Sequence, residues 1–147
     1  MNITFMIFLL AISIRIIYIV SQGNDLEEKL IEDELLYWTW SLRGAYTSAG
    51  DLGERLLAER MPGAFYYYQF LMYAMEKNIK YILYFQALID SITCYIIALS
   101  TSKLFTKDYL KVFLFAAISP LMIIMSSQTL AETLFLFLFS LFILFSL

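Results

Sequence analysis

The chain has 147 residues, of which 61% are hydrophobic, 18% aromatic and 16% charged, and its mean hydropathy is +0.74. A soluble domain is about 45–50% apolar and about 25% charged, so this excess of apolar side chains indicates helices that face lipid. The net charge of −3 argues against a nucleic-acid partner, and the absence of His beside a single Cys excludes a His/Cys zinc site, a disulfide framework and Ser–His or Cys–His catalysis. We therefore expect an all-α, polytopic membrane protein whose chemistry depends on carboxylates, Arg, Lys, Tyr and amides.

Four apolar stretches approach the length that crosses a bilayer, which is about 20 residues. They cover about residues 3–20, 81–101, 110–130 and 133–147. The first has no basic n-region and a poor cleavage site, so it is predicted to be an uncleaved span. Pro120 is expected to kink the third. The fourth would extend only about 22 Å, so we expect this chain to be the N-terminal part of a longer membrane protein.

The loops predict an orientation. Lys103, Lys107 and Lys111 lie in or beside the short loop between the second and third spans. The positive-inside rule places this loop, and with it the N-terminus, in the cytoplasm. Residues 21–80 then form one long extracytoplasmic loop, and Glu132, at the turn before the fourth span, lies on the same side.

This loop is patterned as juxtamembrane helices. Asn24 with Glu27 resembles a capping box ahead of leucines at helical spacing, and Asp51 with Glu54 repeats the signal. Residues 62–75 are aromatic, too short to cross and too apolar for water. They are predicted to form a helix in the membrane interface.

Two charges lie within predicted spans, where ionisable groups are costly and normally paired or functional. Arg15 is about 8 Å below the end of the first span, and Asp90 about 14 Å below the start of the second. We expect a structural Arg15–Asp90 ion pair. In the alternative interpretation, Arg15 reaches a lipid phosphate. Cys94 is expected to be a small packing residue within the second span.

The acidic triplet Glu32-Asp33-Glu34 precedes Tyr37 and Trp38, which share helix faces with Asp33 and Glu34. Crowded carboxylates beside a low-dielectric surface suit a general base or a cation ligand. The alternative is a solvated acidic face on a juxtamembrane helix. Glu132 is open to both kinds of interpretation, since it either lines a cavity with the triplet or extends to the interface.

These features follow one another in an order that resembles the N-terminal third of the GT-C membrane glycosyltransferases, in particular the protein O-mannosyltransferase and aminoarabinose-transferase branch. The motifs that carry the resemblance are Asp33-Glu34-Leu35-Leu36-Tyr37-Trp38, Arg60-Met61-Pro62-Gly63 before a Tyr-rich helix, Gln86 and Asp90, Ser119-Pro120, and Gln128-Thr129-Leu130-Ala131-Glu132-Thr133.

The resemblance implies an inverting transfer of a sugar from a polyprenyl-phosphate-linked donor, within membrane lipids and at the extracytoplasmic face. Asp33 matches the acid that activates the acceptor, with Glu34 in support, and Glu132 matches a second acidic position of the cavity. Arg15 and Arg60 are candidates to contact the donor phosphate. Some GT-C enzymes use a divalent cation such as Mg²⁺ or Mn²⁺ and others use none; Asp33 and Glu132 would be its ligands.

Two other functions compete with this one. A non-catalytic polytopic membrane subunit or scaffold would leave the acids solvated. A component of a lipid-linked-sugar flippase or polymerase would be expected to carry more charge within its spans than Arg15 and Asp90 provide.

Overall fold

The computed structural model describes residues 2–23, 25–26, 30, 38–39, 41, 62–105, 108–128 and 132–147. Within these ranges all regular structure is helical and no strand is present, so the all-α prediction is confirmed for the part of the chain described. The helices are α1 (Ile3–Ser21), α4 (Pro62–Ala74), α5 (Ile79–Phe105), α6 (Tyr109–Ile118), α7 (Pro120–Ser126) and α8 (Glu132–Ser146).

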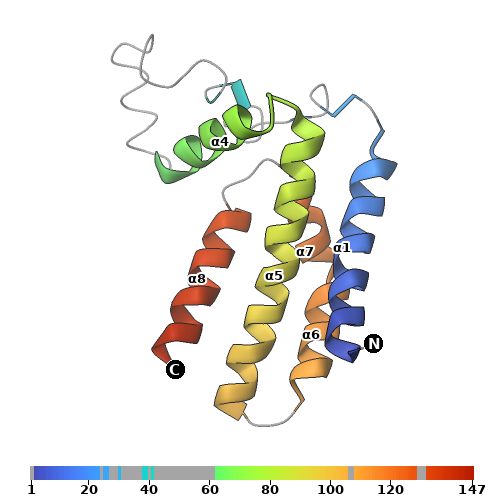
Figure 1. Cartoon of the computed structure of the whole chain (residues 1–147), viewed down its shortest axis with the longest axis vertical. Helices are drawn as coiled ribbons and strands as arrows, with labels where there is room; N and C mark the ends of the chain where they lie inside the picture. Colours follow the sequence, from blue (N-terminus) through green and yellow to red (C-terminus); the bar gives the residue numbers. More distant parts are fainter. Residues whose placement is uncertain are drawn as a thin grey trace.

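Helix α5 is the centre of the bundle. It packs against α1, α4, α6, α7 and α8. The chain rises through α1, descends through α5, rises again through α6 and α7 and descends through α8, while α4 lies across the upper end of α5 (Figure 1). The end of α1, the start of α5 and the start of α8 therefore all lie toward the α4 end, and the N-terminus and the α5–α6 turn lie at the other.

Two helices are long and apolar enough to cross a membrane, α1 with 19 residues and α5 with 27. The bent pair α6–α7 adds a third if it counts as one broken span, and α8 is a shorter apolar helix of 15 residues. The chain is thus a membrane protein with two or three candidate spans among the described residues. The fourth span and the extracytoplasmic placement of residues 21–80 stay predictions.

The predicted third span, residues 110–130, is not one continuous helix. Helix α6 ends at Ile118, Ser119 is extended (φ −60°, ψ 121°), and α7 begins at Pro120 with its axis turned by 57°. Proline has no backbone N–H, its ring collides with the preceding helical turn, and it moves the residue before it out of the helical region. The kink expected at Pro120 is therefore confirmed, and it is sharp enough to divide the span in two.

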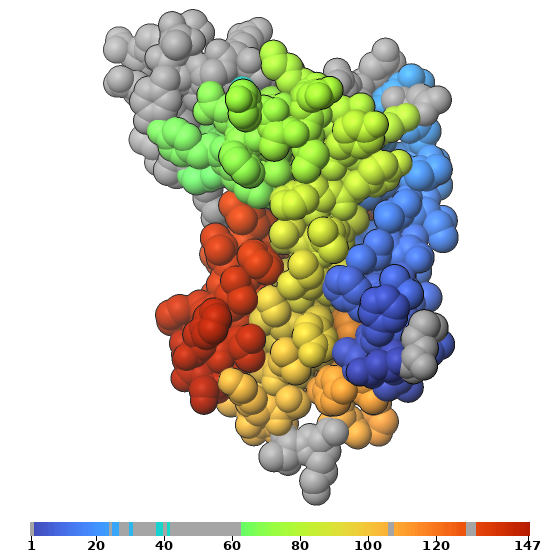
Figure 2. Space-filling view, in the orientation of Figure 1, coloured from blue at the N-terminus to red at the C-terminus, as the bar shows by residue number. Residues whose placement is uncertain are grey.

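Among the described residues, buried side chains form two clusters. The α4 cluster joins the inner face of α4 to the upper ends of α1 and α5, and the α1–α5–α6 cluster joins those three helices lower in the bundle. Figure 2 shows α4 covering the upper end of α5, with α1 and α8 on either side below it. The members of the α4 cluster include Ile19, Leu26, Trp38, Phe65, Tyr68, Leu71, Ile82 and Leu83, and those of the second are Ile7, Ala11, Cys94, Ala98, Phe113 and Ala117.

A tight turn sets α4 across α5. Glu76 and Lys77 adopt left-handed conformations (φ 52° and 59°), and the Lys77 N–H donates to the Met72 carbonyl over 2.8 Å. The side chain of Asn78 then accepts from the N–H of Lys80 over 3.0 Å at the start of α5. The predicted aromatic helix at 62–75 is confirmed as a helix. The capping signals at Asn24–Glu27 and Asp51–Glu54 belong to residues outside the described ranges.

Candidate functional site

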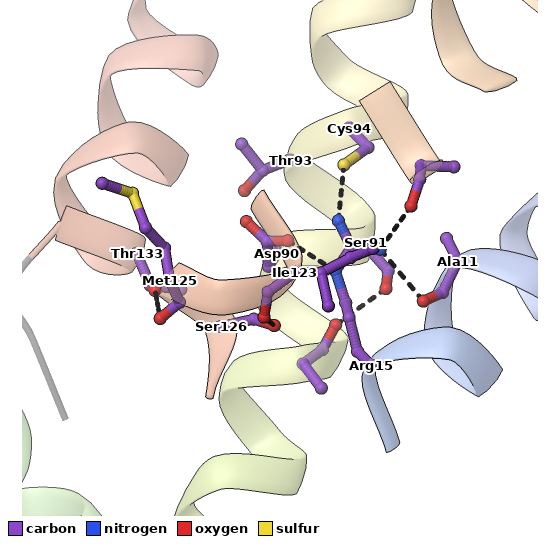
Figure 3. Close-up of polar contacts among 12 residues, drawn as sticks. Ala11, Arg15, Asp90, Ser91, Thr93, Cys94, Ile123, Met125, Ser126 and Thr133 are labelled. Atoms are coloured by element: carbon purple, nitrogen blue, oxygen red, sulfur yellow. Dashed lines mark hydrogen bonds and ion pairs between the residues drawn. The ribbon is translucent and has the colours of Figure 1, made fainter. Parts of the chain in front are cut away.

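The ion pair expected between the first two spans is present. Arg15 of α1 donates from Nε to Oδ2 of Asp90 on α5 over 2.6 Å, and the side chains are 0% and 1% exposed (Figure 3). Both residues lie on buried helix faces. Arg15 follows Ile7 and Ala11 at four-residue spacing on the inner side of α1, and Asp90 is one of the buried residues of α5. The pair therefore ties α1 to α5 in the interior of the bundle.

The rest of the guanidinium is also occupied. Nη1 donates to the carbonyls of Ala11 and Ala117, each over 3.0 Å, and Nη2 donates to Sγ of Cys94 over 3.2 Å. All three nitrogens of Arg15 are thus hydrogen-bonded to atoms of α1, α5 and α6. A lipid phosphate could replace these partners only if the network opened, so the structure favours the ion-pair interpretation of Arg15 over the headgroup alternative.

Arg15 also caps the end of α6. The last carbonyls of a helix have no donors of their own, and here Pro120 removes one N–H that would otherwise continue the ladder. Ala117 accepts from Arg15, and Ala116 accepts from Cys94 Sγ over 3.5 Å and from the Ser119 N–H over 3.3 Å. A guanidinium beside a helix C-terminus also interacts favourably with the helix dipole.

Cys94 has a second role that the sequence analysis missed. It packs in the α1–α5–α6 cluster as expected, and it also links Arg15 to the α6 end through its thiol. The available signal was its position four residues after Asp90, which puts both side chains on one face of α5.

Three buried polar atoms of the described residues have no hydrogen-bond partner, namely Tyr67 Oη, Gln86 Oε1 and Asp90 Oδ1. Gln86 uses its Nε2 to donate to Tyr68 Oη over 2.7 Å, which joins α5 to α4. Asp90 Oδ1 points away from Arg15 (Figure 3). Burial raises the pKa of Tyr67 to about 12, so its hydroxyl stays neutral.

Hydroxyl side chains lie on the side of Asp90 that faces away from Arg15 (Figure 3). Thr93 and Ser126 donate to the carbonyls of residues three or four positions earlier in their own helices, over 2.9 and 2.8 Å. Thr133, near the start of α8, donates instead to the carbonyl of Met125 in α7 over 3.3 Å (Figure 3). This last bond links α8 to α7.

The predicted catalytic acids Asp33 and Glu34, and Arg60, lie outside the described residues. Two residues that flank the acids in the sequence are described, and both Leu30 and Trp38 pack in the α4 cluster.

Glu132 is described as the first residue of α8. It is exposed, and it makes no hydrogen bond or ion pair with the part of the chain that the structure describes. An acid in the first turn of a helix is stabilised by the helix dipole, and this position lies toward the α4 end of the bundle (Figure 1).

A divalent cation at Asp33 and Glu132 would depend on residues that only partly fall within the described ranges. Among the described residues no group of three or more His, Cys, Asp and Glu side chains is arranged to hold a metal ion. The polar network around Arg15 and Asp90 joins three helices, and Asp90 Oδ1 is its unpartnered atom among the described residues. Comparisons with protein-family models, with characterised proteins and with solved structures find no match to this chain.

Proposed function

We propose that this chain is the N-terminal part of a GT-C-type membrane glycosyltransferase, which moves a sugar from a polyprenyl-phosphate-linked donor to an acceptor at the extracytoplasmic face. The proposal is supported by the order of the motifs and by a helical bundle with a Tyr-rich helix, α4, across one end.

The observation that carries the proposal is where the flanks of the acidic segment pack. Leu30 and Trp38 enclose Asp33 and Glu34 in the sequence, and both contact the α4 cluster. Helix α8 begins with Glu132 toward the same end of the bundle (Figure 1). This arrangement favours one cavity, at the α4 end, that receives acids from both stretches.

The chemistry needs few groups. Asp33 would take the proton of an acceptor hydroxyl as the hydroxyl oxygen attacks the anomeric carbon, and the bond from that carbon to the phosphate oxygen would break with inversion. The rest of the rate enhancement would come from two effects. The enzyme positions the acceptor, and a cation stabilises the departing polyprenyl phosphate. Arg60 is the proposed phosphate contact, because the guanidinium of Arg15 is buried and each of its three nitrogens already donates a hydrogen bond within the bundle.

The test is sugar transfer by membranes that contain the complete gene product with Asp33→Asn. Loss of a general base is expected to lower transfer by about 10²–10⁴-fold, with membrane insertion unchanged. Asp25→Asn is the matched control, since Asp25 is an exposed acid of the same loop. Transfer that Asp33→Asn leaves at the wild-type rate would refute the assignment of Asp33.

A non-catalytic membrane subunit is the second candidate, and the exposed position of Glu132 favours it. At the first turn of α8 this acid stabilises the helix without any ligand. In that case Asp33→Ala and Glu132→Ala would both preserve the function of the complex to which the chain belongs, whereas the transferase requires Asp33.

A further inference from the structure

Helix α4 is held to α5 by a buried polar contact as well as by apolar packing. Gln86 of α5 donates from Nε2 to Oη of Tyr68 over 2.7 Å, and both side chains are 0% exposed. Tyr68 is the central residue of α4, which begins at Pro62 and ends at Ala74. The hydrogen bond therefore joins the midpoint of α4 to the buried face of the central helix of the bundle.

This contact limits how α4 can move on α5. Apolar packing is non-directional, so the contacts of Phe65, Leu71 and Leu83 around it in the α4 cluster tolerate a small rotation of α4 about its axis. A hydrogen bond weakens steeply once its donor and acceptor are misaligned or farther apart than about 3.2 Å. Because α4 lies across the upper end of α5 (Figure 1), Gln86 fixes the orientation of α4 above the bundle.

Stability alone does not explain a glutamine at this position. A buried amide must recover the hydrogen bonds that it loses to water, and here Oε1 of Gln86 has no partner among the described residues. Replacing both members of a hydrogen-bonded pair by apolar groups of the same shape can be neutral or stabilising. The pair therefore carries a cost that an apolar pair would not, and what it provides in return is a fixed orientation.

The flanks of the segment that carries the proposed base pack beside α4. Leu30 and Trp38 lie in the α4 cluster, on either side of Asp33 in the sequence. Ser41 donates from Oγ to the carbonyl of Phe65, a residue of α4, over 3.5 Å. Three residues of chain span at most about 11 Å, so Asp33 lies within that distance of Leu30. A displacement of α4 would therefore move the acid with it.

We propose that Gln86 is a positioning residue for the transfer reaction: through Tyr68 it holds α4 in the orientation that places Asp33 to take the proton of the acceptor. Neither Gln86 nor Tyr68 is proposed to touch the substrate, since both side chains are fully buried. The inference rests on the glycosyltransferase proposal. It deepens that proposal, because it assigns a role in the reaction to a side chain in the interior of a candidate span.

The first test compares Tyr68→Phe with Tyr67→Phe in the complete gene product, with the polyprenyl-phosphate sugar on which the wild type is active. Both variants remove one hydroxyl from adjacent tyrosines of α4. Tyr67 Oη has no hydrogen-bond partner among the described residues, whereas Tyr68 Oη accepts from Gln86. Per folded molecule, Tyr68→Phe is expected to lower kcat by about 10-fold to 10²-fold, the size of effect that a small misplacement causes, with KM unchanged. Tyr67→Phe is expected to keep the wild-type kcat.

A second variant separates positioning from stability. Gln86→Met combined with Tyr68→Phe leaves neither member of the pair unpaired, so the double variant is expected to unfold at the wild-type temperature. It should nevertheless lose as much kcat as Tyr68→Phe alone, because both substitutions remove the same contact. Hydrogen exchange of residues 62–74 should be faster in the double variant than in Tyr67→Phe, since α4 separates from α5 more often.

The outcomes distinguish this role from the function on which it rests. Equal kcat in Tyr68→Phe and Tyr67→Phe, or a fall in activity that only follows the loss of folded protein, would overturn the positioning role. If Asp33→Asn abolishes transfer while Tyr68→Phe retains it, the positioning role alone fails. If Asp33→Asn transfers sugar at the wild-type rate, the assignment of Asp33 fails and the positioning role fails with it.

Discussion

Arg15 of α1 donates a 3.0 Å hydrogen bond to the carbonyl of Ala117, the penultimate residue of α6, across 102 positions of the sequence. The same guanidinium neutralises Asp90 on α5. One side chain therefore connects three helices and also supplies a donor to the helix end that Pro120 leaves incomplete.

Asp90→Asn should lower stability markedly. Removing one charge of a buried pair leaves the other uncompensated, which costs about 3–5 kcal/mol. The measurement is the yield of folded protein and the thermal unfolding temperature in detergent. Asp108→Asn is the control, since Asp108 forms an exposed ion pair with Lys111 over 2.6 Å, and exposed pairs contribute about 0–1 kcal/mol. Equal effects of the two substitutions would contradict a structural role for the buried pair.

Replacing both partners should be milder than replacing one. In Arg15→Met/Asp90→Leu no unpaired charge stays in the interior, so much of the loss caused by Arg15→Met alone should be recovered. Recovery is expected to be incomplete, because the Ala117 carbonyl still lacks the donor that Arg15 provides. The three variants are compared by thermal unfolding, and a double variant as unstable as the sum of the single ones would contradict the coupling.

Cys94→Ala and Cys94→Ser should differ. Serine keeps an acceptor for Arg15 Nη2 and a donor for the Ala116 carbonyl, whereas alanine keeps neither. Loss of one such hydrogen bond typically costs about 0.5–1.5 kcal/mol, so the alanine variant is expected to be the less stable. The thiol is buried and should resist alkylation in the folded protein. Indistinguishable unfolding temperatures would assign Cys94 to packing alone.

Tyr67 predicts a change in stability at high pH. Burial raises its pKa from 10.0 to about 12, so the unfolded chain loses this proton first and is favoured as the pH rises. Stability that Tyr67 leaves intact below pH 10 should fall between about pH 10 and 12. Tyr67→Phe should remove this part of the decline and should also remove the unpartnered hydroxyl. The difference between the two unfolding profiles isolates Tyr67 from the other tyrosines, and parallel profiles would contradict the assignment.

Some of this arrangement was predictable from the sequence. Two charges within apolar stretches at comparable depth predict a pair, and a proline within a span predicts a kink, because both inferences use only helical rise and backbone chemistry. The division of residues 110–130 into α6 and α7 was harder to predict, since helix propensity does not give the angle of the bend at a proline. Helix α8 has 15 residues, which is shorter than a full crossing, so the fourth span stays a prediction.

The partners of Arg15 beyond Asp90 were not predictable. A backbone carbonyl is the same group at Ala117 as anywhere else, so only the three-dimensional path of α6 makes it an acceptor for Arg15. The Gln86–Tyr68 hydrogen bond likewise depends on α4 crossing α5, which no local pattern encodes. Asp33, Glu34 and Arg60 were singled out by the resemblance alone, and they stay predictions.

The order of synthesis gives the Arg15–Asp90 pair a further consequence. The ribosome completes α1 before it adds Asp90, which follows Arg15 by 75 residues. At about 5–20 residues per second the interval is roughly 4–15 s, and a guanidinium deep in a nascent span costs about 2.5–3.5 kcal/mol on insertion scales. Helix α1 is more apolar than α5, and this surplus lets the first span enter the bilayer before its counter-ion exists.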